Sequence, residues 1–184
     1  MHFPIGRTTV ATALLQVSLS SFAGLILSPA LASPPEGQVL GKPVQHCRLA
    51  VFVNDPDPAG LNLRSAPGTE SRVLATIVDR DAMLDVTGSS GKWLRVERVR
   101  NADGTVQFEG EAWVFGPFTG VRSNRPLGLL AAPQQTSPVV ARMPAERTGV
   151  VLACDAMWVR VRHGNTGGWM APGAHCGNSV TTCV

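Results

Sequence analysis

The 184-residue chain contains no tyrosine, and only 5% of its residues are aromatic. Modules that bind proline-rich helices usually do so in an aromatic groove that includes several tyrosines. Recognition of proline-rich peptides is therefore a poor expectation for this protein.

A recognisable set of catalytic residues is also lacking. The chain has four histidines, and none of them stands in a sequence pattern with a nucleophile that would indicate acid–base or nucleophilic catalysis. We therefore expect a protein that is not an enzyme and that uses no cofactor and no metal. A small hydrolase is the alternative.

Charged residues are scarce, at 16% of the chain, and the formal net charge is only +3. So mild an excess of positive charge does not indicate a nucleic-acid partner. The charge is unevenly divided, however. Residues 33–120 carry nine Lys or Arg and eleven Asp or Glu, a net of −2, whereas residues 121–184 carry six and two, a net of +4.

This division has two interpretations. In the first, the halves attract each other, and some of three arginines in the second half face some of three aspartates in the first. The residues concerned are Arg142, Arg147 and Arg160, and Asp79, Asp81 and Asp85. In the second interpretation, the arginines form a surface for an anionic ligand.

The N-terminus has the layout of a cleaved export signal. Arg7 precedes an uncharged run over residues 8–27, and Ala30-Leu31-Ala32 has the small-x-small pattern that signal peptidases accept. We predict a signal peptide over residues 1–32, and a mature protein that is periplasmic or extracellular with no membrane partner. A retained membrane anchor is the alternative, because the uncharged run is long enough to span a bilayer. Residues 33–46, rich in Pro, Gly and polar groups, are predicted to be a flexible leader.

All four cysteines follow the predicted cleavage site. An even number of cysteines in an exported chain favours disulfides. Three pairings are possible, and the one favoured here joins Cys176 to Cys183 and Cys47 to Cys154. The alternative, a zinc site made by the pairs His46-Cys47 and His175-Cys176, lacks the local ligand spacing of such sites.

The body of the chain has almost no helical periodicity. Short runs rich in Val, Leu, Ile and Trp are separated by Pro, Gly, Asn and Asp, and they cover residues 49–53, 61–64, 72–78, 83–87, 93–99 and 106–115. Strands of this length and spacing indicate a small antiparallel barrel or sandwich. The Asp-Gly pair at 103–104 indicates a hairpin between the last two runs.

A segment of the first half recurs in the second. LNLRSAPGTES at 61–71 corresponds to LGLLAAPQQTS at 127–137, and seven of the seventeen positions from 61 to 77 are identical at an offset of 66 residues. WLRV at 93–96 then matches WVRV at 158–161, and AWV at 112–114 matches GWM at 168–170. The sequence therefore predicts a duplicated β unit whose second copy is shorter.

The order of these elements, from LNLRSxPGT through Trp-x-x-Val to a closing Trp-Val, resembles the bacterial SH3-like (SH3b) domain. The first copy carries the pattern well, whereas the second lacks the equivalents of Asn62, Arg64 and Gly68. The resemblance implies an all-β protein with two small SH3-like barrels in tandem, at 47–122 and 123–184. It also implies a cell-wall ligand, either peptidoglycan peptide or glycan. The alternative is a structural or interaction module whose partner is another exported protein.

Strand alternation suggests which residues contact a ligand. It places Leu94 and Val96 on one face, and Trp93 and Arg95 on the other. An aromatic ring beside an arginine can stack on a peptide or sugar and bind a carboxylate. In the second copy, Trp158 and Arg160 share a face in the same way. The alternative is that Trp93 and Trp158 each close an end of their barrel, and Trp113 and Trp169 are expected in the core.

Asn62 and Arg64 precede a turn at residues 66–69 in which Gly68 is expected to take the positive φ of a type II turn. In the second copy Gln134 replaces this glycine, so the turn there is expected to be different or strained. Turn formation alone is the alternative role for this segment. The candidate ligand-binding residues are thus Asn62, Arg64, Trp93, Arg95, Trp158 and Arg160.

Overall fold

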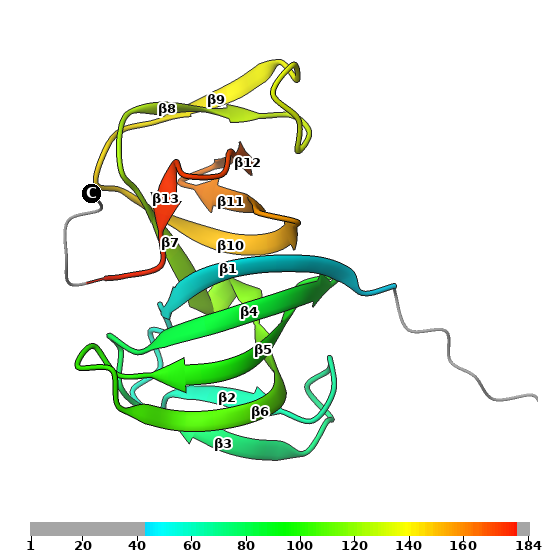
Figure 1. Cartoon of the computed structure of the whole chain (residues 1–184), viewed down its shortest axis with the longest axis vertical. Coiled ribbons are helices and arrows are strands. Elements are labelled where there is room, and N and C mark those ends of the chain that lie inside the picture. Colours follow the sequence, from blue (N-terminus) through cyan, green and yellow to red (C-terminus); the bar gives the residue numbers. More distant parts are fainter. Residues whose placement is uncertain (1–42, 180–184) are drawn as a thin grey trace, which may run out of the picture. The chain divides into compact units, whose positions relative to one another are not determined.

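The computed structural model describes residues 43–179, all of which belong to the same structural unit (Figure 1). The first six strands are β1 (Gln45–Val53), β2 (Leu61–Arg64), β3 (Val73–Ile77), β4 (Met83–Ser90), β5 (Trp93–Arg100) and β6 (Val106–Phe115). A short 3₁₀ turn, η1 (Gly116–Phe118), separates them from the remaining strands. These are β7 (Thr119–Ser123), β8 (Leu127–Leu130), β9 (Val139–Met143), β10 (Thr148–Asp155), β11 (Trp158–His163), β12 (Thr166–Met170) and β13 (His175–Cys176).

The all-β prediction is confirmed, since residues 43–179 contain no α-helix. Each of the six predicted runs coincides with one of strands β1 to β6, and the predicted hairpin joins β5 to β6. Strand β1 begins earlier than expected, at Gln45, and so includes the last two residues of the predicted leader. The predicted signal peptide and residues 33–42 of the leader lie outside the described part of the chain. No helix between residues 43 and 179 is long and apolar enough to cross a membrane.

The strands pair into one antiparallel sheet. Its order is β3-β2-β6-β5-β4-β1-β7-β10-β11-β12-β8-β9, and β13 pairs with β7 away from this path. Outward from the central β1–β7 pair, the two halves follow the same sequence of equivalent strands. The pairing shows one open sheet with β3 and β9 at its edges, and does not by itself show the two closed barrels predicted from the sequence.

The core follows the predicted alternation. Leu94, Val96, Val159 and Val161 are completely buried, as are many other apolar side chains of both halves. These side chains form a single apolar cluster that extends from one half into the other. Burial of this continuous apolar surface is the main stabilising contribution to the fold.

Strand β1 joins the two halves. Its end pairs with β7, where Phe52 lies opposite Gly120. A Cβ atom at position 120 would come within 2.7 Å of the Phe52 ring, so only glycine permits this approach. The start of β1 contacts Ala156, whose N–H donates to the His46 carbonyl and whose carbonyl accepts from Arg48 N–H. Both ends of β1 therefore contact the second half.

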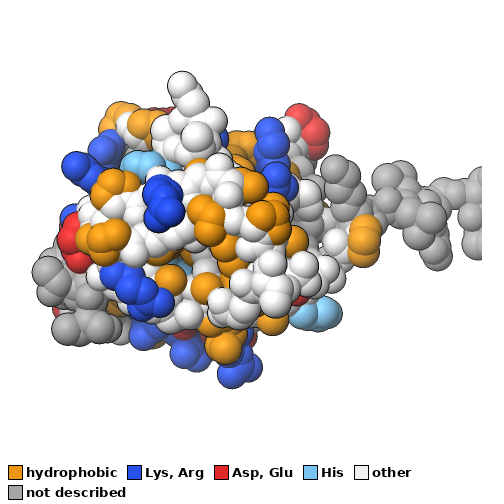
Figure 2. All heavy atoms as spheres, turned by 90° about the horizontal axis from the view of Figure 1, so that it is seen from above, with side chains coloured by type: hydrophobic (Ala, Val, Ile, Leu, Met, Phe, Trp, Pro, Cys, Tyr) orange, Lys and Arg blue, Asp and Glu red, His pale blue; other side chains and the backbone are white. Residues whose placement is uncertain are grey.

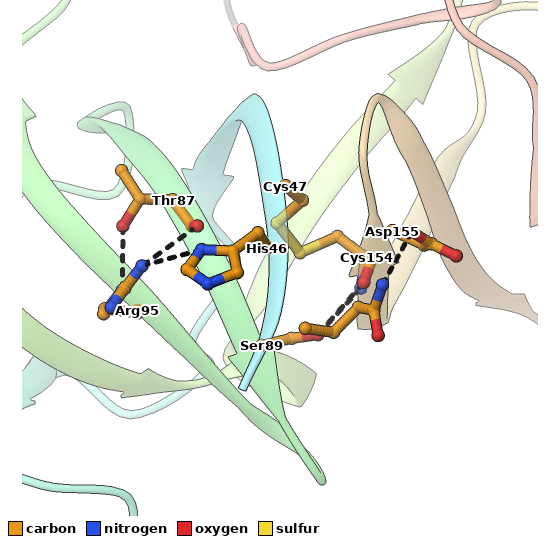
Figure 3. Close-up of a disulfide and its surroundings, with 8 residues drawn as sticks. His46, Cys47, Thr87, Ser89, Arg95, Cys154 and Asp155 are labelled. Atoms are coloured by element: carbon orange, nitrogen blue, oxygen red, sulfur yellow. Dashed lines mark hydrogen bonds between the residues drawn. A yellow bond between two sulfur atoms is a disulfide. The ribbon is translucent and has the colours of Figure 1, made fainter. Parts of the chain in front are cut away.

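A disulfide between Cys47 and Cys154 reinforces this junction (Figure 3). The Ser89 hydroxyl donates to the Cys154 carbonyl at 3.1 Å and accepts from its N–H at 3.2 Å. The predicted pairing is confirmed, and because Cys47 is oxidised, the alternative zinc site loses one ligand. The second predicted pairing reaches Cys183, which lies outside the described residues and stays a prediction.

The charged groups do not join the halves in the predicted way. Asp85 accepts a charged hydrogen bond of 2.7 Å from Arg100 in its own half. Between residues 43 and 179, no ion pair involves Arg142, Arg147 or Arg160, and all three side chains are exposed. Viewed from above, the molecule shows separate Lys and Arg side chains with few Asp or Glu among them (Figure 2). The predicted Arg–Asp contacts between the halves are therefore not formed, and apolar packing, strand pairing and the disulfide make the junction instead.

Candidate functional site

The first half carries a cavity of about 280 Å³ at the start of strand β2. Its walls come from the β1–β2 loop, β2, the loop that follows β2, the start of β5, the end of β6, and η1. The lining residues are Asp55, Asp57, Gly60, Leu61, Asn62, Arg64, Thr69, Trp93, Phe115 and Phe118. Three of the six predicted binding residues therefore lie in one cavity.

Aromatic side chains form the apolar side of this cavity. Trp93 lies opposite Phe115 in the β5–β6 register, so both rings are on the same face, and their centroids are 5.4 Å apart. The turn η1 follows β6 at once and brings Phe118 to 5.3 Å from Phe115 in an edge-to-face contact. The three rings make a continuous aromatic row.

Arg64 and Asn62 have structural partners as well as a place in the cavity wall. Arg64 Nη1 donates to the carbonyls of Thr69 at 2.6 Å and Ser71 at 2.7 Å. Asn62 Oδ1 accepts from the Thr76 hydroxyl at 2.8 Å on the neighbouring strand. Arg64 thus holds the loop that forms one wall, which agrees with the alternative role of turn formation.

The turn after β2 is not of the predicted type. Gly68 has a φ of +155°, far from the value of about +80° that a type II turn requires. The Ser71 N–H instead donates to the Gly68 carbonyl at 3.2 Å. In the second half, Ser137 N–H makes the equivalent bond to Gln134 at 3.1 Å, and Gln134 has no positive φ. The second turn therefore keeps the same closing bond but differs at this position, as expected, and Gln134 shows no left-handed strain.

Two aspartates form the polar rim. The Asp55 carboxylate is nearly buried, with 6% of the residue exposed, and accepts from the Asp57 N–H at 3.0 Å. The Asp57 carboxylate accepts from the Ala59 N–H at 2.9 Å. Both bonds order the loop that closes one end of the cavity.

Arg95 shares the face of Trp93 but lies outside this cavity. Its guanidinium donates to the Thr87 hydroxyl at 3.1 Å and lies 3.4 Å from His46 Nδ1 (Figure 3). It also forms a 3.7 Å ion pair with Glu111. It lines a separate hollow of about 570 Å³ that also contains Glu97, Arg98, Glu109 and Glu111. The prediction that Trp93 and Arg95 act together is not supported by this arrangement.

Trp113 lies between the two arginines. It pairs in register with Arg64 on one side and with Arg95 on the other, and only 6% of it is exposed. Its predicted burial is confirmed, although it lies outside the main apolar cluster. The equivalent Trp169 is only partly buried.

The second half does not reproduce the aromatic cavity. Trp158 and Arg160 line neither the aromatic cavity nor the hollow beside Arg95. By the repeat alignment, Leu130 stands at the position of Arg64, and Ala171 at that of Phe115. The β7–β8 connection spans only residues 124–126, whereas the β1–β2 loop spans 54–60. Without these groups, the second half has neither the rim nor the aromatic row.

Sequence reasoning missed the other seven cavity residues, among them the rim aspartates Asp55 and Asp57 and the aromatic residues Phe115 and Phe118. The available signals were the loop NDPDPAG, present only in the first half, and the two phenylalanines of FGPF directly after the closing Trp-Val. Neither signal indicates by itself that the two segments meet.

Comparison with known proteins gives a partial family match. Residues 59–119 match the family model described as the bacterial SH3 domain. This segment runs from the end of the β1–β2 loop to the first residue of β7, and includes eight of the ten cavity residues. A search of the curated proteins finds no match.

Solved structures that resemble the chain are distant. NlpC1 from Trichomonas vaginalis has 12% sequence identity and a TM-score of 0.30, over 78% of this chain and 51% of that one. NlpC2 from the same organism has 12% identity and a TM-score of 0.29, over 71% of this chain and 48% of that one. The chain thus spans about half the length of either structure. Similarity at this level carries no functional information.

Proposed function

We propose that this protein is an exported, non-enzymatic binding module that recognises cell-wall material, peptidoglycan peptide or glycan, through the aromatic cavity of its first half. The observation that carries the proposal is the row Trp93, Phe115 and Phe118, which lines a cavity inside the segment that matches the bacterial SH3 domain. Domains of this family are often cell-wall binding modules.

The chemistry of the cavity suits contact with a short segment of a polymer. Aromatic faces stack on sugar rings and on apolar parts of peptides, and the polar groups at the rim orient what is bound. A volume of about 280 Å³ is small for a complete ligand, because pockets for drug-sized molecules hold roughly 300–1,000 Å³. A polymer that enters with one or two units fits this size.

The buried disulfide supports the proposed export. Disulfides form and persist in oxidising compartments, such as the periplasm and the extracellular space. Cys47 and Cys154 are 107 residues apart and both are buried, so their bond belongs to the folded architecture. The signal peptide predicted over residues 1–32 would deliver the chain there.

The shared strand order supports a tandem arrangement of two SH3-like units. Strands β2 to β6 and β8 to β12 have the same pairing order within their halves. In this proposal the first unit binds the cell-wall material, and the second unit has lost the equivalent of the β1–β2 loop.

Purified sacculi provide the test. The mature protein is expected to be retained on sacculi in low salt, and Trp93→Ala to reduce retention about fivefold or more, because a stacked aromatic contributes on the order of 1–3 kcal/mol. The matched control is Trp158→Ala, which removes the equivalent ring of the second half and is expected to bind like the wild type. Circular dichroism verifies that both variants fold. Absence of wild-type retention would refute the proposal, as would equal losses in the two variants.

A second candidate function is interaction with another exported protein. The observation that favours it is the pair of open sheet edges, where β3 exposes Val73 and Leu74, and β9 exposes Val139 and Val140. Exposed edges with apolar side chains can pair with a strand of another chain. Val140→Lys is then expected to abolish co-purification of a specific exported protein, while Trp93→Ala leaves it intact. If Trp93→Ala abolishes co-purification and Val140→Lys leaves it intact, the aromatic cavity is the binding site.

A further inference from the structure

A second, broader hollow adjoins the aromatic cavity. Its volume is about 670 Å³, and it shares Asp55 and Phe118 with the aromatic cavity. Pro56 and Pro117 form part of its floor, and 37% of Phe118 is exposed between the two spaces. A ligand that leaves the aromatic cavity across Phe118 therefore enters this hollow.

The hollow contains two arginines, one from each half of the chain. Arg80 lies in the turn between β3 and β4, and Arg162 lies in β11. Arg80 Nη2 donates to the Pro56 carbonyl at 3.1 Å, and Arg162 Nη1 donates to the Gly164 carbonyl at 3.4 Å. A guanidinium has five N–H donors, so most donors of each arginine are not used by these bonds.

No carboxylate within residues 43–179 forms an ion pair with either arginine. The aspartates nearest to them in the sequence and in the hollow have local partners. Asp55 accepts from Asp57 N–H, Asp79 from Asp81 N–H at 2.9 Å, and Asp81 from the Ser179 hydroxyl at 2.8 Å. Neither guanidinium is therefore committed to an ion pair, and both lie in the hollow with the Asp55 carboxylate and apolar proline and phenylalanine side chains.

We propose that this hollow is a second subsite, in which Arg80 and Arg162 bind a carboxylate of the same peptide that occupies the aromatic cavity. Guanidinium groups favour carboxylates because their fork of donors matches the two carboxylate oxygens. The inference rests on the proposed function and narrows it. The ligand is a cell-wall peptide with a free carboxylate, and the second half contributes to binding through Arg162.

The test uses soluble fragments released from purified sacculi by a glycan-cleaving enzyme. One portion is kept as isolated, and in the other the carboxyl groups are converted to amides with a carbodiimide and ammonium chloride. Isothermal titration calorimetry measures the affinity of both portions for the wild type, Arg80→Gln, Arg162→Gln, the double variant and Trp93→Ala. Arg142→Gln is the matched control, because it removes the same charge from edge strand β9, outside the hollow.

Each single variant is expected to weaken binding of the untreated fragments about three- to tenfold, the range for exposed charge-assisted bonds. Amidation is expected to weaken wild-type binding to a similar degree or more, and to have little further effect on the double variant. Arg142→Gln is expected to bind like the wild type.

Other outcomes overturn one proposal or both. If Trp93→Ala weakens binding but amidation and the arginine variants do not, the second subsite is wrong and the cell-wall function stands. If amidation weakens binding equally in the wild type and the double variant, a carboxylate is recognised elsewhere and the assignment to these arginines is wrong. If neither portion binds the wild type, the proposed function fails and the subsite with it.

Discussion

The two halves of this protein have the same strand order and differ in their loops. The apolar positions of the repeat, such as Leu63 and Leu129, are completely buried in both halves. The first half has a seven-residue β1–β2 loop and the aromatic row, whereas the second has a three-residue connection and Ala171 at the position of Phe115.

The comparison shows that the features shared by the two halves are those that folding requires, whereas the features that differ lie in the loops. A β unit keeps its architecture as long as its inward-facing side chains stay apolar and its turns can form. Loops tolerate deletion because they contribute little to the core, and binding residues are concentrated on them. The second half has the strand order of the first without its aromatic cavity.

The largest expected effect concerns the disulfide that links the halves. Replacing both Cys47 and Cys154 by Ala is expected to lower the free energy of unfolding by about 4–5 kcal/mol, because their bond closes a loop of 107 residues in the unfolded chain. Denaturant unfolding measures the loss, and hydrogen exchange shows which half opens first. A loss below about 1 kcal/mol would mean that strand pairing and the shared core hold the halves together without it.

An intermediate effect is expected where the two halves hold the same loop with different side chains. In the first half Arg64 donates to two carbonyls of the loop after β2, whereas in the second the Ser137 hydroxyl accepts from Ala132 N–H at 2.9 Å. Arg64→Leu, which installs the residue of the second half, is expected to cost about 1–2 kcal/mol, and Ser137→Ala about 1 kcal/mol. Thermal unfolding measures both. Faster amide exchange should appear only in the loop of the altered half, and exchange that spreads to the other half would contradict this local assignment.

The smallest expected effect is a pH dependence confined to the second half. Burial lowers the pKa of His175 below its usual value of about 6.5, against a smaller opposing contribution from a backbone hydrogen bond with Met157. Below about pH 6.5 the unfolded chain takes up a proton that the folded chain still excludes. The contribution of neutral His175 to the free energy of unfolding is therefore complete above this pH, and it declines as the pH falls toward the lowered pKa.

His175→Gln is expected to remove this part of the decline, which unfolding curves between pH 7.5 and 4.5 would measure. His163→Gln is the control, because His163 lies at the surface end of β11. An unchanged slope in His175→Gln would show that other groups cause the decline.

Much of the fold could be predicted from the sequence, because strands and turns leave local signals. The alternation Trp93-Leu94-Arg95-Val96 predicted both a strand and its buried face. The Asp-Gly pair predicted the hairpin that joins this strand to the next. The pairing of β1 with β7 could not be predicted, because hydrogen bonds between distant strands leave no local pattern. The count of cysteines narrowed the disulfides to three arrangements, and the structure selects Cys47 with Cys154.

The candidate site was predicted only in part. Asn62, Arg64 and Trp93 were found because they stand out in a repeated motif. Phe115 and Asp55 were missed because each belongs to a different element, and only the β5–β6 register and the β1–β2 loop bring them to Trp93. Arg95 was grouped with Trp93 on the basis of a shared face, yet residues two apart on a strand contact different neighbours, and here Thr87 and Glu111 bind the arginine.

The position of strand β1 gives a reason why a half without the cavity is retained. One side of β1 pairs with β4, and the other contacts Ala156 and β7. A chain that ended after η1 would expose this second side as an unpaired strand edge and would leave Cys47 without its partner. Such edges recruit other chains and lead to aggregation. In the full chain the second half covers this edge through β7 and Ala156 and supplies the disulfide partner of Cys47, a structural role that requires no ligand of its own.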